Sequence, residues 1–317
     1  MGEFDLIARY FTRPVHRATL GVGDDCALLA PAPGMQLAVS SDMLVQGRHF
    51  FADVDPERLG HKALAVNLSD LAACGARPLA FTLALSLPRV DEAWLAGFSR
   101  GLLALADGHG CELVGGDTTQ GPLNICITVF GEVPAGQALL RSGARPGDDI
   151  YVSGTLGDAR LALEALQGHI TLPADVLAAA RLRLEQPTPR VALGQALRGV
   201  ASSALDVSDG LLGDLGHILR ASGTGACIDT FIAIDLIAAS ALSISARGQF
   251  DPELFHQCTL AGGDDYELAF TAPVARRAAV AAAALASSTP VTRIGRIEAE
   301  PGLRLVDAQG RPVVQRY

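Results

Sequence analysis

Short apolar runs that end in aspartate recur along the chain, and they constrain its fold more than any other feature. The clearest run covers residues 65–78, where Asp70 stands among small and apolar residues. Burying an ionised carboxylate is unfavourable unless a partner or a cation compensates its charge. Five other stretches place one or two acids beside Gly or Ser in the same way: residues 23–26, 40–42, 115–118, 206–210 and 262–265.

Each of these stretches also has an ordinary structural explanation. Aspartate commonly caps helices and Asp-Gly commonly forms turns, so a single stretch is more easily interpreted as a cap or a turn. Six stretches that each place an acid after an apolar run favour a shared anionic cluster instead. Carboxylates that end strands and are spread along a chain suit a multi-metal site that handles phosphates.

Composition narrows the class of protein. The 317 residues suffice for two domains, and 49% hydrophobic against 19% charged residues predicts a large core. A net charge of −9 disfavours nucleic-acid binding, because phosphate backbones attract basic surfaces. Six cysteines without a CxxC pair are interpreted as buried thiols of a reducing compartment. The sequence has no signal-peptide pattern and no apolar run of membrane-spanning length, so we expect a cytoplasmic protein without a membrane partner.

Helical spacing and strand-like alternation occur in both halves of the chain. The expected helices span residues 3–12, 56–74, 91–108, 158–166, 174–186, 189–199, 211–222 and 274–287. The expected strands span residues 36–45, 79–87, 112–114, 124–133, 149–153, 201–205, 266–271 and 291–298, with a turn and strand in 21–29 and a hairpin at 303–314. Pro and Gly between 134 and 148 place a domain boundary near residue 145. We therefore expect an α/β (α+β) protein with two domains, residues 1–145 and 146–317.

Several common sites are excluded by their missing motifs. Lys62 is the single lysine and lies in no Gly-rich loop, so the chain has no P-loop. Residues 21–23 begin like a dinucleotide fingerprint, but Cys26 stands at its sixth position and two acids precede it. The zinc-protease motif HExxH and the nucleophile elbow GxSxG are also missing. What remains is aspartate, hydroxyls, Gly-rich turns and arginine, a set that can bind a nucleoside triphosphate through Mg²⁺.

The motifs together resemble the thiamine-monophosphate kinase family, within the superfamily related to aminoimidazole ribonucleotide synthetase. The resemblance runs in order from residue 2 to about residue 300. It is carried by residues 21–29, 40–42, 62–76, 115–119, 141–144, 206–211 and 263–268.

The resemblance implies a two-domain fold of the aminoimidazole ribonucleotide synthetase type, with a C-terminal α/β domain and an N-terminal sheet that forms the interface of a homodimer. It implies transfer of the γ-phosphoryl group of ATP, as co-substrate, directly and in line onto thiamine monophosphate, assisted by several Mg²⁺ ions. The product would be thiamine diphosphate. No further catalytic residue is expected, because the acceptor phosphate is already anionic and needs no general base.

The site residues follow from the matching motifs. The expected metal ligands are Asp25, Ser40, Ser41, Asp42, Asp70, Asp117, Asp206 and Asp209. The expected ATP-binding residues are Gly116, Asp117, Arg141 and Ser208. The expected residues for the thiamine substrate are His49, Asp264 and Tyr317.

Two other functions, and other roles for individual residues, stay open at this point. The chain could be a related enzyme that uses ATP on another small substrate, or a nucleotide-binding protein without catalytic activity. His49 could be a structural histidine, and Arg141 an ordinary surface arginine. The family often has Glu where Asp264 stands, and Tyr317 is the candidate for an aromatic residue that packs on thiamine.

Overall fold

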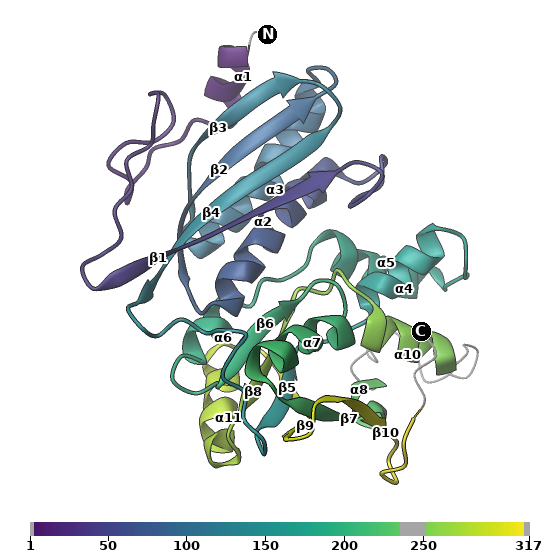
Figure 1. The fold of residues 1–317 in the computed structure, drawn as a ribbon. Coiled ribbons are helices and arrows are strands. Elements are labelled where there is room, and N and C mark those ends of the chain that lie inside the picture. The colour runs from purple at the N-terminus through teal and green to yellow at the C-terminus, as the bar shows by residue number, and fades with distance from the viewer. Residues whose placement is uncertain (1–2, 235–251, 314–317) are drawn as a thin grey trace. The chain divides into compact units, whose positions relative to one another are not determined.

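The computed structural model describes residues 3–234 and 252–313. The chain forms two compact units, one of residues 1–71 and 76–136 and the other of residues 72–75 and 137–317. Residues 137–145, which the sequence patterns place in the first domain, lie in the second unit. Each unit is described by itself below, and Figure 1 labels their helices and strands.

The first unit is a sheet with helices on one face. Its strands are β1 (Met35–Val45), β2 (Arg77–Leu87), β3 (Glu112–Gln120) and β4 (Asn124–Pro134). Its helices are α1 (Glu3–Tyr10), α2 (Pro56–Ala73) and α3 (Glu92–His109). The strand order is β1-β4-β2-β3, with β2 and β3 parallel and the other pairs antiparallel. Helices α2 and α3 cover one face of this sheet (Figure 1).

Local sequence explains these elements well. Asp91 accepts hydrogen bonds from the backbone N–H groups of Ala93 and Trp94 and so caps α3, and Gly110 ends that helix in a left-handed conformation. In β4, buried residues alternate with partly buried ones, as expected for a strand with helices on one face. The predicted helices and strands of this unit are confirmed to within a few residues, with two exceptions.

The exceptions lie around the glycines. Strand β3 continues to Gln120 rather than ending at Val114, because Gly115 and Gly116 pair with β2. Residues 21–29 form a loop closed by a bridge between Leu20 and Leu28, not a strand. Cys26 lies in this loop and is exposed, so the prediction that all cysteines are buried is wrong, although Cys111 and Cys258 are buried.

The second unit is built on a second sheet. Its strands are β5 (Asp149–Ser153), β6 (Ser203–Val207), β7 (Gly225–Asp229), β8 (Glu267–Ala272), β9 (Val291–Glu298) and β10 (Gly302–Val306). Its helices are α4 (Asp158–Leu166), α5 (Ala174–Glu185), α6 (Val191–Ala196), α7 (Leu211–Ser222), α8 (Thr230–Ile234), α10 (Pro252–Ala261) and α11 (Arg277–Ala286), with a 3₁₀ turn at Val274–Arg276. The strand order is β10-β7-β9-β5-β8-β6, in which β10 and β7 are parallel.

The core of this unit joins the sheet to α7. Ile150, Val152 and Val207 on the strands pack with Leu211 and Leu215 on the helix, and all five are almost fully buried. Strand β6 ends at Val207 instead of Leu205, so Asp206 lies inside the strand rather than after it. Strand β7 and helices α8 and α10 were not predicted. The hairpin expected at 303–314 corresponds to β10 and a return that bridges Val306 to Pro312; residue 314 lies outside the described residues.

Across residues 3–234 and 252–313, no helix is both long enough and apolar enough to cross a lipid bilayer.

Candidate functional site

A pair of carboxylates lies between β1 and α2. Successive residues of a strand face opposite sides of the sheet, so Ser40 and Asp42 face the helices. Ser40 donates a hydrogen bond from its hydroxyl to the Asp70 carboxylate on α2. The side-chain oxygen of Asn67, one turn earlier, accepts from the backbone N–H of Asp42 at 3.1 Å. Burial, and then the neighbouring Asp70 carboxylate, raise the pKa of Asp42 to about 6.

Ser41 faces the other side of the same sheet. Its hydroxyl lies 3.0 Å from that of Thr128 and donates to the carbonyl of Ile127 at 3.1 Å. Thr128 on β4 pairs with Thr82 on β2, so the side chains of Ser41, Thr128 and Thr82 form a row across this face of the sheet. Asp117, two residues beyond the partner of Thr82 on β3, shares this face and is exposed. The sheet therefore separates Ser41 and Asp117 from Ser40 and Asp42.

A pocket of about 710 Å³ lies where the 21–29 loop meets β2 and β3. Its lining includes Asp24, Asp25, Thr82, Gly116 and Asp117. Gly116 has φ 147°, and a Cβ there would overlap the carbonyl oxygen of Leu83, so the position requires glycine. The structure thus brings three of the predicted site residues, Asp25, Gly116 and Asp117, to one pocket.

In the second unit, a buried carboxylate shapes the turn between β6 and α7. One oxygen of Asp214 accepts from the backbone N–H groups of Ser208 and Asp209 at 3.0 Å each and of Gly210 at 3.1 Å. Burial raises the pKa of Asp214, against the lowering effect of these N–H groups. The turn leaves the Asp209 side chain exposed, while Asp206 is 7% exposed on the strand. Asp214 was not predicted, although an acid four to six residues after such a turn is a recognisable cap.

The 262–266 segment lies directly against this turn. Asp264 donates its backbone N–H to the carbonyl of Ser208 at 2.8 Å, and Tyr266 donates to the carbonyl of Val207 at 2.8 Å. A Cβ at Gly263 would overlap the Ser208 carbonyl oxygen. Asp264 and Tyr266 adopt left-handed φ values of 67° and 53°, which are uncommon for residues other than glycine. Ser208, Asp209 and Asp264 are therefore brought together.

Two buried acids hold this segment, and neither was predicted as functional. Glu267 is fully buried and accepts from Arg183 at 2.8 Å, from Arg190 at 2.5 Å and from the Ser153 hydroxyl at 2.5 Å. Asp265 is also fully buried, and it accepts from the backbone N–H of Gly157 at 2.7 Å. Burial raises the pKa of Asp265 well above its usual range. These contacts fix the strained backbone of Asp264 and Tyr266 from both sides.

Two predicted residues lie outside the groups described in their own units. His49 is exposed beyond the end of β1, where its Nδ1 accepts from the backbone N–H of Val45 at 3.0 Å and its carbonyl accepts from Lys62 at 3.4 Å. Arg141 is exposed in the loop before β5. Tyr317 lies outside the described residues.

The donor atoms fit Mg²⁺ that arrives with phosphates. Carboxylate and hydroxyl oxygens are its preferred ligands, and it commonly takes one or two carboxylates while waters and phosphates complete its shell. Within residues 3–234 and 252–313, no three His, Cys, Asp or Glu side chains gather closely enough to form a metal cage of their own. Burial, and then the charge of Asp70, raise the pKa of Asp42, and a bound cation would compensate the charges of these two carboxylates.

Two family models match the chain. The N-terminal domain of AIR synthase related proteins matches residues 23–133, and the C-terminal domain of the same proteins matches residues 145–308.

Individual relatives match over nearly the whole length. Thiamine-monophosphate kinase of Salmonella typhimurium (strain LT2) is 48% identical over 318 residues, which cover 98% of this chain and 95% of the relative. The Escherichia coli K12 enzyme of the same name is 48% identical over 320 residues with the same coverage. The crystal structure of thiamine-monophosphate kinase from Stenotrophomonas maltophilia K279a has 45% identity and a TM-score of 0.85, covering 98% of this chain and 96% of that one. The structure of AaThiL complexed with AMPPCP and TMP has 29% identity and a TM-score of 0.77, covering 90% of this chain and 88% of that one.

Proposed function

Because this chain belongs to the thiamine-monophosphate kinase family, we propose that it transfers the γ-phosphoryl group of ATP onto thiamine monophosphate and forms thiamine diphosphate. The transfer is direct and in line, and several Mg²⁺ ions held by the chain's carboxylate and hydroxyl oxygens would screen the triphosphate of ATP from the acceptor phosphate. The structure of AaThiL with AMPPCP and TMP supports this choice of donor and acceptor, since it pairs an ATP-like nucleotide with TMP on a similar fold.

The observation that carries the proposal is the pocket of about 710 Å³ beside β3. Gly115 and Gly116 let phosphate oxygens approach the backbone closely, and Asp24, Asp25 and Asp117 line the same space. Carboxylates would repel a triphosphate directly, so this lining suits a triphosphate whose charge is screened by cations. A pocket for an uncharged ligand would not need three aspartates.

The remaining roles follow the motifs. We assign Mg²⁺ binding to Asp25, Ser40, Ser41, Asp42, Asp70, Asp117, Asp206 and Asp209. We assign ATP contacts to Gly116, Asp117, Arg141 and Ser208, and contacts with thiamine monophosphate to His49, Asp264 and Tyr317. The functional halves are residues 1–145 and 146–317.

The chain's own residues bind and align rather than exchange protons. A cation held by these carboxylates and hydroxyls would screen the donor phosphates from the acceptor phosphate. The Asp214 carboxylate keeps the backbone of Ser208 and Asp209 in one conformation, and the buried Asp265 and Glu267 do the same for Asp264. Alignment of this kind lowers the barrier because the reacting oxygens need not be brought together during the step.

Two further properties belong to this proposal. The chain forms a homodimer through the face of its N-terminal sheet, which exposes Leu37, Val39 and Met43 on β1. It works in the cytoplasm, where its six free cysteines would stay reduced.

The test is ADP release from ATP and Mg²⁺ with thiamine monophosphate, free thiamine or no acceptor. Of these three conditions, we expect ADP to form only when thiamine monophosphate is present. Asp70→Asn should lower the rate by roughly a hundredfold or more, as expected when a group that holds transition-state charge is lost. Asp175→Asn, the same substitution at an exposed position in the first turn of α5, should leave the rate unchanged.

Other outcomes would point to other functions. ADP formed equally without an acceptor would indicate an ATPase or a different acceptor. Tight ATP binding without ADP under any condition would replace the kinase proposal with a nucleotide-binding protein that lacks catalytic activity.

A further inference from the structure

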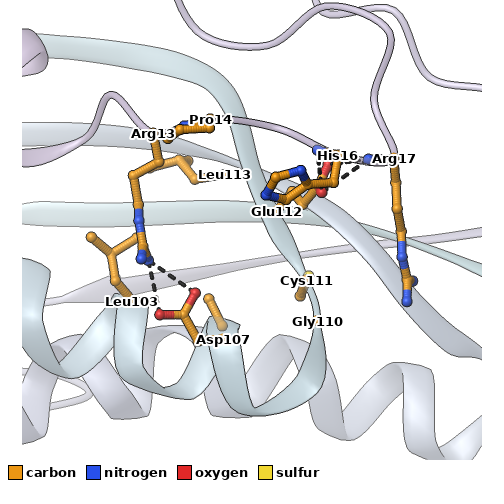
Figure 2. Close-up of a pocket in the computed structure, with 11 residues that line it drawn as sticks. Arg13, Pro14, His16, Arg17, Leu103, Asp107, Gly110, Cys111, Glu112 and Leu113 are labelled. Carbon is orange, nitrogen blue, oxygen red and sulfur yellow. Dashed lines mark hydrogen bonds and ion pairs between the residues drawn. The ribbon is translucent and has the colours of Figure 1, made fainter.

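The chain segment before the 21–29 loop is tied to the sheet at two strands: by Glu112 at the start of β3, and by Arg17, whose guanidinium donates to the carbonyl of Pro78 on β2 at 3.0 Å. The two carboxylate oxygens of Glu112 accept from the backbone N–H groups of His16 at 2.7 Å, Arg17 at 3.0 and 3.1 Å, and Ala18 at 3.1 Å. Figure 2 shows the Glu112 carboxylate beneath the backbone at His16 and Arg17. We call these hydrogen bonds from His16, Arg17 and Ala18 to Glu112 the clamp. Because hydrogen bonds to an ionised acceptor are stronger than those between neutral groups, the clamp holds this segment strongly although Glu112 is only partly buried.

Glu112 is held in its ionised form. Burial by itself would raise the pKa of this carboxyl, but the N–H groups of Ala18, His16 and Arg17 outweigh burial and lower the pKa below its usual range. A neutral amide at this position would keep an oxygen acceptor but lose the charge, and its NH₂ group would face backbone donors.

The clamped segment bridges a cavity rather than lying on a continuous surface. The cavity has a volume of about 500 Å³ and is lined on the sheet and helix side by Leu103, Asp107 and Cys111 (Figure 2). Another tie crosses it, since Arg13 donates to both Asp107 oxygens at 2.9 and 3.1 Å. Both partners of that tie are exposed, so it contributes little compared with the clamp.

The clamp joins the two elements that line the candidate nucleotide pocket. On one side, the loop that carries Asp24 and Asp25 begins just after Ala18, and it is closed where Thr19 donates to the carbonyl of Leu28 at 2.8 Å. On the other side, Glu112 begins the strand that carries Gly116 and Asp117. The hydrogen bonds of Glu112 therefore fix the position of the acidic loop relative to the glycine-containing strand, at a point a few residues before the pocket in each segment.

We propose that Glu112 is a positioning residue: it sets the Asp24–Asp25 loop against Gly116 and Asp117 so that the pocket accepts Mg²⁺ and nucleotide together. This inference rests on the proposed function of that pocket. Glu112 does not line the pocket and does not touch substrate, so its effect passes through the segment it holds.

The rate of proteolysis measures how often the clamp opens, because the Arg17–Ala18 bond lies within it. Trypsin cuts after arginine but not before proline, so it leaves the neighbouring Arg13–Pro14 bond intact. We expect Glu112→Gln to speed cleavage at Arg17 by roughly tenfold, the effect of losing about one charge-assisted hydrogen bond. Mg²⁺ with the non-hydrolysable analogue AMPPCP should slow the cleavage in the wild type and do so less in the variant.

Kinetics provide the second readout. In Glu112→Gln, the Mg²⁺ concentration for half-maximal rate and the KM for ATP should each rise roughly tenfold, while kcat at saturation stays within about threefold. A residue that only stabilised the fold would lower the amount of active enzyme without moving these constants. Glu57→Gln, which breaks the exposed pair between Glu57 and Arg100 in the same unit, is the matched control and should change neither readout.

A second variant keeps the test decisive if Glu112→Gln folds poorly. Glu112→Asp retains the charge with a shorter reach and should give intermediate values of both constants. Unchanged Mg²⁺ and ATP constants in both variants, with an active wild type, would overturn the inference while leaving the proposed function standing. An inactive wild type would instead contradict the proposed function. Protection of Arg17 from trypsin by AMPPCP would then test the role of Glu112 by itself. Protection that is lost in Glu112→Gln would support this role, and equal protection in both proteins would refute it.

Discussion

At the residue scale, the neighbouring carboxylates of Asp42 and Asp70 lower the stability of the metal-free protein, although both are proposed to bind the Mg²⁺ that the reaction needs. Burial and the Asp70 charge raise the pKa of Asp42 to about 6. A group whose pKa is raised on folding stabilises the fold most below its unfolded pKa, and this contribution is lost as pH rises through about 6. At neutral and alkaline pH, the ionised pair therefore destabilises the protein in the absence of a cation.

Asp42→Asn should consequently make the metal-free protein more stable and the enzyme inactive. After allowance for partial exposure of the side chain, we expect a gain of about 1 kcal/mol near pH 8 that disappears below about pH 4. Urea unfolding of both proteins in EDTA at the two pH values measures this difference. An Asn variant that is less stable near pH 8 would show that Asp42 is held by contacts rather than strained by charge.

The residues also show how far sequence reasoning reaches. The motifs identified Asp25, Gly116 and Asp117, which the structure brings to one pocket, because each follows an apolar run in a recognisable pattern. They did not identify Asp214, Asp265 or Glu112. Asp214 binds N–H groups four to six residues earlier, a local spacing that could have been recognised. Asp265 and Glu112 bind N–H groups that are far away in the sequence, and such partners depend on the folded chain.

At the scale of elements, the predicted mixed α/β fold with two AIR synthase-type domains is confirmed. The differences are the longer β3, the loop at residues 21–29, strand β7, and helices α8 and α10. Gly115 and Gly116 weaken the local strand pattern, yet pairing with β2 extends β3 through them. Strand β7 was missed for a different reason: it is short, and its parallel partner β10 lies far away in the sequence.

The close packing of α2, the helix that carries Asp70, against α3 depends on two glycines. A Cβ at Gly101 would overlap the carbonyl of Glu57, and one at Gly60 would overlap that of Phe98. Gly101→Ala should cost about 3 kcal/mol or more, because a backbone must move, and should raise the Mg²⁺ requirement by tilting α2. Thermal unfolding and Mg²⁺ titration of the rate measure the two effects.

Gly108 supplies the control for that substitution. It lies in the same helix, is exposed, and a Cβ there meets nothing within 4 Å. Gly108→Ala should be neutral or stabilising by up to about 1 kcal/mol, since alanine favours the helix. Equal effects of the two substitutions would mean that the contact between α2 and α3 adds no cost at Gly101.

At the scale of the whole molecule, β1 is an edge strand with an apolar face. Leu37, Val39 and Met43 alternate along it and are 45%, 56% and 53% exposed. Exposed apolar rows on an edge strand favour association, and a second copy of the same sheet would cover them. The homodimer proposed above would bury this face.

Val39→Asp should therefore convert the dimer to a monomer at micromolar concentration, as measured by analytical ultracentrifugation. A charge in a buried interface without a partner costs several kcal/mol, enough to dissociate most dimers. Leu285→Asp on α11, where the side chain is 83% exposed, is the matched control and should leave the mass unchanged. A wild type that sediments as a monomer would contradict the dimer.

Lys62, the single lysine of the chain, is 3% exposed on α2. Amine-reactive reagents will therefore hardly modify its side chains: acylating dyes will label them weakly, and cross-linkers that need a lysine on each copy will not join two associated chains. The absence of a cross-linked band on a gel would therefore not show that the chain is a monomer. The exposed thiol of Cys26, which lines the candidate nucleotide pocket, offers the better handle, since a thiol reagent placed there would respond to nucleotide directly.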